Sequence, residues 1–161
     1  PKQCVAFARS MTSATAATTT WYRGAPITNY LVPSGTGYIL GNFSNFAPLQ
    51  PGTMIAYFRN QSQYPGGTNP GHVAIFLSWE YVNGKVVAMN VVDQNLIPNI
   101  KINNVVVSTI KPSGTIEGQA DGMIQKHQLP LTCTAGSLCN TDTKYTNPRY
   151  WAFNYHVVDV K

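Results

Sequence analysis

The hydrophobic residues of this chain fall into short runs separated by turn-forming residues, which is the pattern of β-strands. The runs occupy residues 52–58, 72–80, 85–95, 103–110 and 151–160. In the last run, aromatic and aliphatic side chains recur at every second position, so we expect one buried face there. Asn83-Gly84 separates two of the runs and is a strong signal for a tight β-hairpin turn. The pattern therefore predicts an antiparallel sheet built around that hairpin.

The N-terminal segment has a different pattern and predicts a short helix. Residues 2–11 combine small and apolar side chains and contain neither glycine nor proline. Proline and glycine recur between residues 24 and 51, and residues 111–150 lack a clear periodicity, so we expect loops in both regions. We expect a single domain over residues 1–161. Its predicted fold class is α+β, with the helix packed on a central antiparallel β-sheet.

The composition narrows the functional classes. Only 11% of the 161 residues are charged, which disfavours a coiled coil or a charged disordered tail. The net charge is +5, so an anionic partner such as a cell-wall polymer is favoured. The basic residues are scattered singly along the chain, and we predict no nucleic-acid binding. No apolar run approaches the ~20 residues of a membrane-spanning helix, so we expect no membrane span.

The three cysteines divide into a pair and a single residue. Cys133 and Cys139 lie in a segment rich in Thr, Gly and Ser that is able to bend back on itself, and we expect a disulfide between them. The alternative is a pair of free thiols, and the spacing does not favour a metal site. A disulfide implies an oxidising compartment, so we expect a secreted or periplasmic protein, although no signal peptide is recognisable in this chain. Cys4 is left as a candidate nucleophile.

The hairpin predicts a catalytic base together with the group that orients it. Counting equally from Asn83-Gly84 places His72 opposite Asn95, with Asp93 two residues away on the same face. Either Asp93 or Asn95 is then able to hold the imidazole of His72. If the N-terminal helix packs across this end of the sheet, Cys4 supplies the nucleophile, and the first turn of a helix favours its thiolate. Each residue alone is more often structural, so only their combination points to nucleophilic catalysis.

An ordered set of short motifs contains these residues: Gln3-Cys4-Val5, Pro51-Gly52-Thr53, Gly71-His72-Val73-Ala74 and Asp93-Gln94-Asn95. The set resembles the CHAP amidases, within the wider group of NlpC/P60 and papain-like cell-wall cysteine hydrolases. Within this group, the sequence most resembles small bacterial proteins, some of which resemble amidase effectors of type VI secretion. The resemblance covers residues 2–95 and departs from the family pattern at Thr53, where Asp is usual, and at Asp93, where Glu is usual.

The resemblance implies a papain-like fold and a peptidoglycan hydrolase that cleaves an amide bond. In such an enzyme His72 would activate Cys4, and the Gln3 side chain and the Cys4 backbone N–H would bind the oxyanion. The segment Trp21-Tyr22-Arg23 sits where the family often carries an aromatic residue after the nucleophile helix, and we expect Trp21, Tyr22 and Arg23 to bind substrate. Neither a cofactor nor a metal is implied.

We favour an N-acetylmuramoyl-L-alanine amidase, because aromatic rings such as those of Trp21 and Tyr22 suit a sugar on one side of the cut. Two alternatives stay open: an endopeptidase of the same fold that cuts within the stem peptide, and a cell-wall-binding module without activity. An antibacterial toxin and a housekeeping hydrolase would share the same site. We expect a monomer that acts on peptidoglycan or a muropeptide and that, if it is a toxin, has an immunity protein as its inhibitor.

Overall fold

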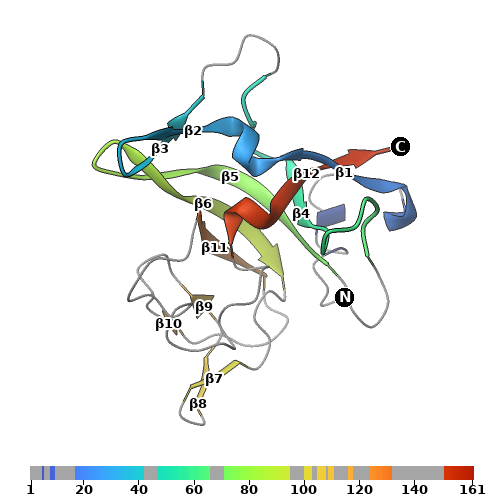
Figure 1. The fold of residues 1–161 in the computed structure, drawn as a ribbon. Coiled ribbons are helices and arrows are strands. Elements are labelled where there is room, and N and C mark those ends of the chain that lie inside the picture. The colour runs from blue at the N-terminus through green and yellow to red at the C-terminus, as the bar shows by residue number, and fades with distance from the viewer. Residues whose placement is uncertain are drawn as a thin grey trace.

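The computed structural model describes residues 5, 8–9, 17–41, 47–65, 71–94, 100–102, 105–107, 109–110, 116–117, 124–131 and 151–161. Its main body is an eight-stranded antiparallel sheet that curls along its length (Figure 1). The strands lie in the order β1 (Trp21–Pro26), β12 (Tyr155–Val160), β4 (Met54–Tyr57), β5 (His72–Val82), β6 (Lys85–Gln94), β3 (Gly37–Leu40) and β2 (Leu31–Ser34). The eighth strand, β11 (Ile124–Pro130), pairs with residues 88–94 of β6. β3 pairs with the same strand nearer its beginning, where Tyr38 lies opposite Val86.

Several shorter elements accompany the main sheet. Three single turns of 3-10 helix are described: η1 (Thr18–Thr20), η2 (Ile27–Tyr30) and η5 (Ala152–Asn154). Two small sheets pair β7 (Ile100–Ile102) with β8 (Val105–Val107), and β9 (Thr109–Ile110) with β10 (Ile116–Glu117). Figure 1 shows both small sheets below β11, away from β2 and β3.

This architecture corrects the predicted fold class. Among the described residues only Val5, Ala8 and Arg9 are α-helical, and the remaining regular structure is strand or 3-10 turn. The prediction of a papain-like α+β fold, with a nucleophile helix packed on the sheet, is therefore wrong. The described fold is a curled antiparallel sheet.

Prolines explain much of this error, because β1, β2, β3 and β11 lie in segments that the sequence predicted as loops. Pro26 and Pro130 are the last residues of β1 and β11, and Pro33 lies in the edge strand β2. Strand ends and edge strands tolerate a residue without an N–H. Pro26 and Pro33 fall in the region that the sequence predicts as loop because of its prolines and glycines, whereas β11 lies in a region predicted as loop because it lacks periodicity.

Both faces of the sheet carry a hydrophobic cluster. The first cluster includes Ile55, Ala74, Phe76, Met89, Val91, Leu129 and Tyr155. The second cluster contains Ala8, Trp21, Ala56, Phe58, Tyr64 and Val73. Neighbouring residues of one strand alternate between the clusters, because successive side chains of a strand point to opposite faces. The beginning of β5 is therefore buried from both sides.

The turn between β5 and β6 has the geometry that the sequence predicted. Asn83 and Gly84 have positive φ angles of 50° and 77°. A two-residue turn of type I′ requires positive φ at both central positions, which asparagine and glycine adopt most easily. Val82 and Lys85 pair directly beside this turn.

The register of the hairpin survives two irregularities. Leu77 is an extra residue in β5, and Val87 is an extra residue in β6. Because one residue is inserted on each side, the two shifts cancel. Ile75 therefore pairs with Val92, at equal distances from the turn, as the sequence predicted.

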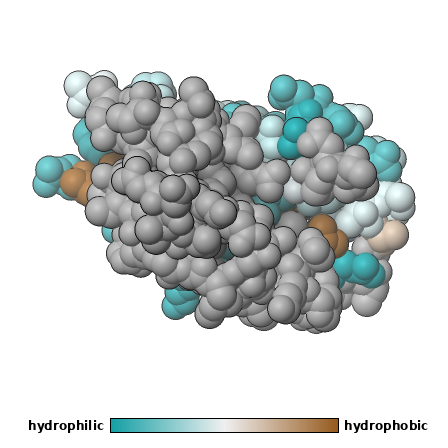
Figure 2. All heavy atoms as spheres, turned by 90° about the horizontal axis from the view of Figure 1, so that it is seen from below, coloured by the Kyte–Doolittle hydropathy of each residue, from teal (hydrophilic) through white to brown (hydrophobic). Residues whose placement is uncertain are grey.

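On the face shown in Figure 2, the described residues are mostly hydrophilic. Figure 2 shows described residues in teal and white at the rim of that view, with only small brown areas. Exposed apolar side chains gather on the β2–β3 hairpin and beside the β5–β6 turn: Val32, Ile39, Leu40, Tyr81 and Val82. No helix within the described ranges is long and apolar enough to cross a membrane.

Replacing Trp21 by alanine is expected to cost about 3–5 kcal/mol of unfolding free energy, because a fully buried indole would leave a cavity in the second cluster. Trp21→Phe should cost much less, since the buried indole N–H has no hydrogen-bond partner to lose. Urea unfolding followed by circular dichroism measures both values. Tyr22→Ala, at the next and half-buried position, is the matched control. Unchanged stability of Trp21→Ala would contradict the buried placement.

Candidate active site

Gly71 fixes the point at which β5 begins. Its amide donates a hydrogen bond of 3.1 Å to the carbonyl oxygen of Pro65. A Cβ atom at this position would collide with the carbonyl oxygen of Tyr57 and press on the side chains of Tyr64 and Pro65. Only glycine lets the chain pass so close to the end of β4. The next residue, His72, is then held beside Tyr57 as its pairing partner.

His72 and Asp93 form a buried hydrogen-bonded pair across the β5–β6 hairpin. The Nε2 atom of His72 lies 2.9 Å from Oδ2 of Asp93. The two side chains are 1% and 0% exposed, so water hardly screens their interaction. An ionised carboxylate can only accept a hydrogen bond, so Nε2 carries the hydrogen and the neutral ring keeps its lone pair on Nδ1.

The strand register explains why these two side chains meet. Phe76 and Val91 pair with each other and both belong to the first cluster. His72 and Asp93 lie an even number of residues further along their strands, so they share that face of the sheet. Within the described residues, no group of three or more His, Cys, Asp and Glu side chains is arranged to hold a metal ion. An imidazole that is held by a buried carboxylate is a candidate for proton transfer.

The described part of the N-terminal segment packs on the second cluster, on the opposite face of the sheet from the His72 and Asp93 side chains. Ala8 is fully buried in the second cluster together with Val73, the residue that follows His72. Val5 packs against this cluster as well. Gln3 and Cys4 lie outside the described residues. The segment that carries the predicted nucleophile is thus anchored, through Val5 and Ala8, close to the beginning of β5.

The structure places the other predicted site residues differently. Trp21 is fully buried, and its ring packs edge-on against Tyr64 with a centroid separation of 5.6 Å. Trp21 was expected to bind substrate, and in the described fold its side chain exposes no surface to solvent. Tyr22 is half-buried with the Lys161 ammonium 5.6 Å from its ring centroid, and Arg23 is exposed. The remaining predicted residues lie outside the described ones: Asn95, Cys133 and Cys139.

The segment that follows β4, which the sequence predicts as a loop between two strands, contains a turn with left-handed backbone. Arg59 and Asn60 both have positive φ, 52° and 60°, and the Gln61 amide closes the turn by donating to the Phe58 carbonyl at 2.9 Å. A left-handed backbone is unfavourable for arginine, and strain of ~1–3 kcal/mol per residue is often retained at functional sites. The turn contains no glycine, so the sequence predicted a loop here but not its left-handed backbone.

This turn brings a positive charge close to Tyr57, the pairing partner of His72. The guanidinium of Arg59 lies 5.8 Å from the ring centroid of Tyr57. Tyr57 is the residue that pairs with His72 across β4 and β5. Arg59 is therefore a functional candidate that only the structure reveals.

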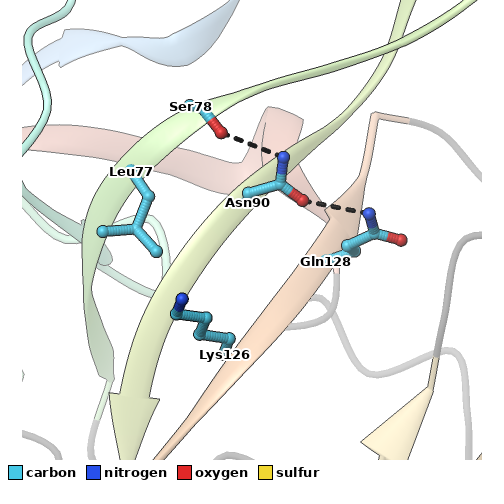
Figure 3. Close-up of a pocket in the computed structure, with 5 residues that line it drawn as sticks. All are labelled: Leu77, Ser78, Asn90, Lys126 and Gln128. Carbon is cyan, nitrogen blue, oxygen red and sulfur yellow. Dashed lines mark hydrogen bonds between the residues drawn. The ribbon is translucent and has the colours of Figure 1, made fainter.

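A hollow of about 440 Å³ lies on the opposite face of the sheet from His72 and Asp93 (Figure 3). Leu77, Ser78, Asn90, Lys126 and Gln128 line it. Asn90 donates a hydrogen bond to Ser78, and Gln128 donates one to Asn90, each at 3.0 Å. These side chains form a ladder that ties β5, β6 and β11 together, and we assign them to sheet stability.

Comparisons with known proteins show a shared fold. No protein-family model matches the chain. No curated protein matches it significantly either. One solved structure, a type 6 secretion amidase effector 2 (Tae2), matches with a TM-score of 0.51 and 19% identity, over 99% of this chain and 81% of that chain. At this identity the likeness shows that the two proteins share a fold.

Gly71→Ala is expected to displace the start of β5 and to weaken the His72–Asp93 hydrogen bond, because the added methyl group meets backbone that has no room to move. A buried imidazole N–H held by a carboxylate gives a slowly exchanging proton signal in nuclear magnetic resonance. That signal should shift or disappear in Gly71→Ala. Gly37→Ala is the control, since its methyl group meets only the flexible side chain of Lys85. An unchanged His72 signal in Gly71→Ala would show that Gly71 does not position the histidine.

Proposed function

We propose that this chain is a cysteine hydrolase that cleaves an amide bond of peptidoglycan, with Cys4 as nucleophile and His72 as base. The observation that carries the proposal is the buried contact between His72 Nε2 and Asp93 Oδ2. A carboxylate that holds one imidazole nitrogen leaves the other nitrogen prepared to take up a proton. The fold shared with an amidase effector supports amide hydrolysis. The motifs that resemble CHAP amidases support peptidoglycan as the substrate.

The reaction begins with transfer of the Cys4 thiol proton to Nδ1 of His72. The thiolate adds to the carbonyl carbon of the scissile amide, and the resulting oxyanion accepts hydrogen bonds from the Cys4 backbone N–H and the Gln3 side chain. His72 returns the proton to the amine as the C–N bond breaks, which leaves a thioester on Cys4. Water then gives a proton to His72 and attacks the thioester, and the departing thiolate takes that proton back.

Asp93 is the better candidate for the group that orients His72. Its carboxylate fixes the tautomer of the ring and also stabilises the imidazolium that forms during the reaction. The contact is buried, so this charge interaction is stronger than it would be in water. Asn95 stays an alternative for a supporting amide at the same end of the hairpin.

Two bonds are candidates for the cut. The amide between the sugar lactyl group and L-Ala is the first, and a bond within the stem peptide is the second. Burial of Trp21 removes one of the two rings expected to hold a sugar, whereas Tyr22 keeps part of its surface exposed. Mass spectrometry of digested muropeptides separates the cases. Free stem peptides that begin with L-Ala indicate the amidase, and disaccharides that keep L-Ala and D-Glu indicate the endopeptidase.

The setting that fits this activity is an antibacterial effector acting in the periplasm of a target cell. The similar solved structure is an effector of type 6 secretion, and the present chain shares its fold. A net charge of +5 suits an anionic wall polymer. A cell that makes such a hydrolase would need an immunity protein that covers the site around His72.

Cys4→Ala and His72→Ala are expected to abolish the release of muropeptides from purified sacculi, because each removes an essential part of the acyl transfer. Asp93→Asn should lower the rate about 10²–10⁴-fold, since the amide no longer stabilises the imidazolium. Chromatography of the soluble products measures the rates. Lys126→Gln, an exposed substitution on the other face, is the control and should leave the rate unchanged.

A cell-wall-binding module without activity gives a different pattern in the same assay. The wild-type protein would sediment with sacculi and release nothing, and the Cys4 and His72 variants would bind equally well. Wild-type rates in folded Cys4→Ala protein would refute the proposed nucleophile.

The Cys133–Cys139 disulfide remains a prediction from the sequence. Alkylation without reductant, followed by intact-mass measurement of the unfolded protein, should add one label, on Cys4, because the other two thiols are expected to be bonded. Closing so short a loop should contribute about 2 kcal/mol, so reduction should lower the unfolding free energy modestly. Three labels on the oxidised protein would show that the bridge is absent.

A further inference from the structure

We propose that a small cavity beside His72 is a binding subsite for a carboxylate of the substrate peptide. The cavity measures about 270 Å³ and is lined by Tyr57, Phe58, Asn60, Phe153, Asn154 and His156. It lies where β4 ends and β12 begins. The identity of the substrate rests on the proposed function, whereas the binding chemistry rests on the cavity itself.

The strand pairing places this cavity next to the proposed catalytic pair. Tyr57, which lines the cavity, pairs with His72 on one side and with Tyr155 on the other. The end of β4, the start of β5 and the start of β12 therefore lie at one end of the sheet. The cavity is therefore one strand away from His72, with Tyr57 between them.

Two arginines lie close to residues that line the cavity, although neither lines it. Arg59 lies over the ring of Tyr57, 5.8 Å from its centroid. Arg23 pairs with Val158, which lies on the same face of β12 as His156. The pKa of His156 lies below its ordinary value, mainly because the ring is partly buried and also because Arg23 is positively charged. The imidazole is therefore neutral near pH 7. The charge of Arg23 thus acts on an imidazole of the cavity wall, in addition to the larger effect of burial.

No carboxylate lines the cavity, and the described acids nearby are engaged elsewhere. Asp93 is bonded to His72. Asp159 lies 3.7 Å from the Lys161 ammonium, and Glu80 accepts a hydrogen bond from Asn90 at 3.0 Å. The two arginines are thus not balanced from within the cavity, which favours an anionic ligand.

His156 supplies a polar group that the described fold does not use. Its Nδ1 atom is buried without a hydrogen-bond partner, and its ring packs edge-on against Phe58 at 6.1 Å between centroids. A buried N–H without an acceptor is rarer than a buried acceptor without a donor. We therefore place the hydrogen of the neutral ring on Nε2, where it is able to donate to a ligand oxygen. The side-chain amide of Asn60 is a second donor of this kind.

The proposed carboxylate subsite gives the strained turn at Arg59 and Asn60 a function. The left-handed backbone of Arg59 and Asn60 directs one side chain over Tyr57 and the other to the cavity wall. A neutral sugar would use the aromatic rings and amides but has no need of the two arginines. A peptidoglycan stem peptide carries free carboxylates, and a carboxylate matches both guanidinium and amide donors. The charges therefore favour a peptide carboxylate over a sugar.

The test measures binding in full-length Cys4→Ala protein, which prevents turnover. The probe is the tripeptide L-Ala-γ-D-Glu-L-Lys as the free acid, and the comparison ligands are the same peptide with its carboxylates amidated and the disaccharide without a peptide. The imidazole signals of His156 in nuclear magnetic resonance report on occupancy. The free acid should shift them in a saturable way, and the amidated peptide and the disaccharide should not.

Variants sharpen this test. Arg59→Gln should weaken binding of the free acid about tenfold or more, since a charged hydrogen bond is lost. Arg59→Lys should retain most of the affinity, and Lys126→Gln should retain all of it. In the protein with intact arginines, affinity should fall as salt rises, which keeps the proposal testable even if Arg59→Gln does not fold.

Equal shifts with the amidated peptide, a response to the disaccharide instead of the free acid, or affinity independent of salt would each overturn the carboxylate subsite. Failure of the proposed function looks different. It would appear as absent hydrolysis by the protein with Cys4 intact, whereas these binding measurements involve no turnover.

Discussion

The buried hydrogen bond between His72 and Asp93 is the interaction on which the arrangement of this end of the sheet depends. An imidazole and an ionised carboxylate are costly to bury unless each satisfies the other with good geometry. The surrounding elements supply that geometry. The type I′ turn at Asn83-Gly84 sets the register, the inserted residues of β5 and β6 compensate each other, and Gly71 fixes where β5 starts.

Antiparallel pairing then brings several candidate functional residues to the same end of the sheet. The end of β4, the start of β5, the end of β6 and the start of β12 are neighbours in the sheet. This arrangement puts the arginine-bearing turn after β4 and the imidazole of His156 within one or two strands of His72. The second cluster anchors the N-terminal segment on the other face, through Val5 and Ala8. The His72–Asp93 pair and the cavity at the start of β12 thus lie at one end of the sheet, and the described part of the N-terminal segment packs on its opposite face.

The part of this arrangement that the sequence predicted depends on local signals. The Asn-Gly turn and the flanking hydrophobic runs were enough to predict the hairpin and to place His72 near Asp93. The α+β fold class was wrong, because β1 and β11 end at prolines and pair with strands far away in the chain, which no local pattern records. Trp21 was predicted to face substrate because of its neighbours in sequence, yet burial in the second cluster is a tertiary property. The turn at Arg59 depends on tolerated strain, which has no sequence signature.

The central claim is that the His72–Asp93 pair activates Cys4, and the pH dependence of Cys4 alkylation tests it most directly. Peptide mapping by mass spectrometry follows Cys4 separately from the other cysteines. A thiolate paired with an imidazolium should react well below pH 7, and His72→Ala should move the reactivity toward the ordinary cysteine range near pH ~8.5. The same alkylation profile in the wild-type and His72→Ala proteins would show that His72 and Cys4 do not act together.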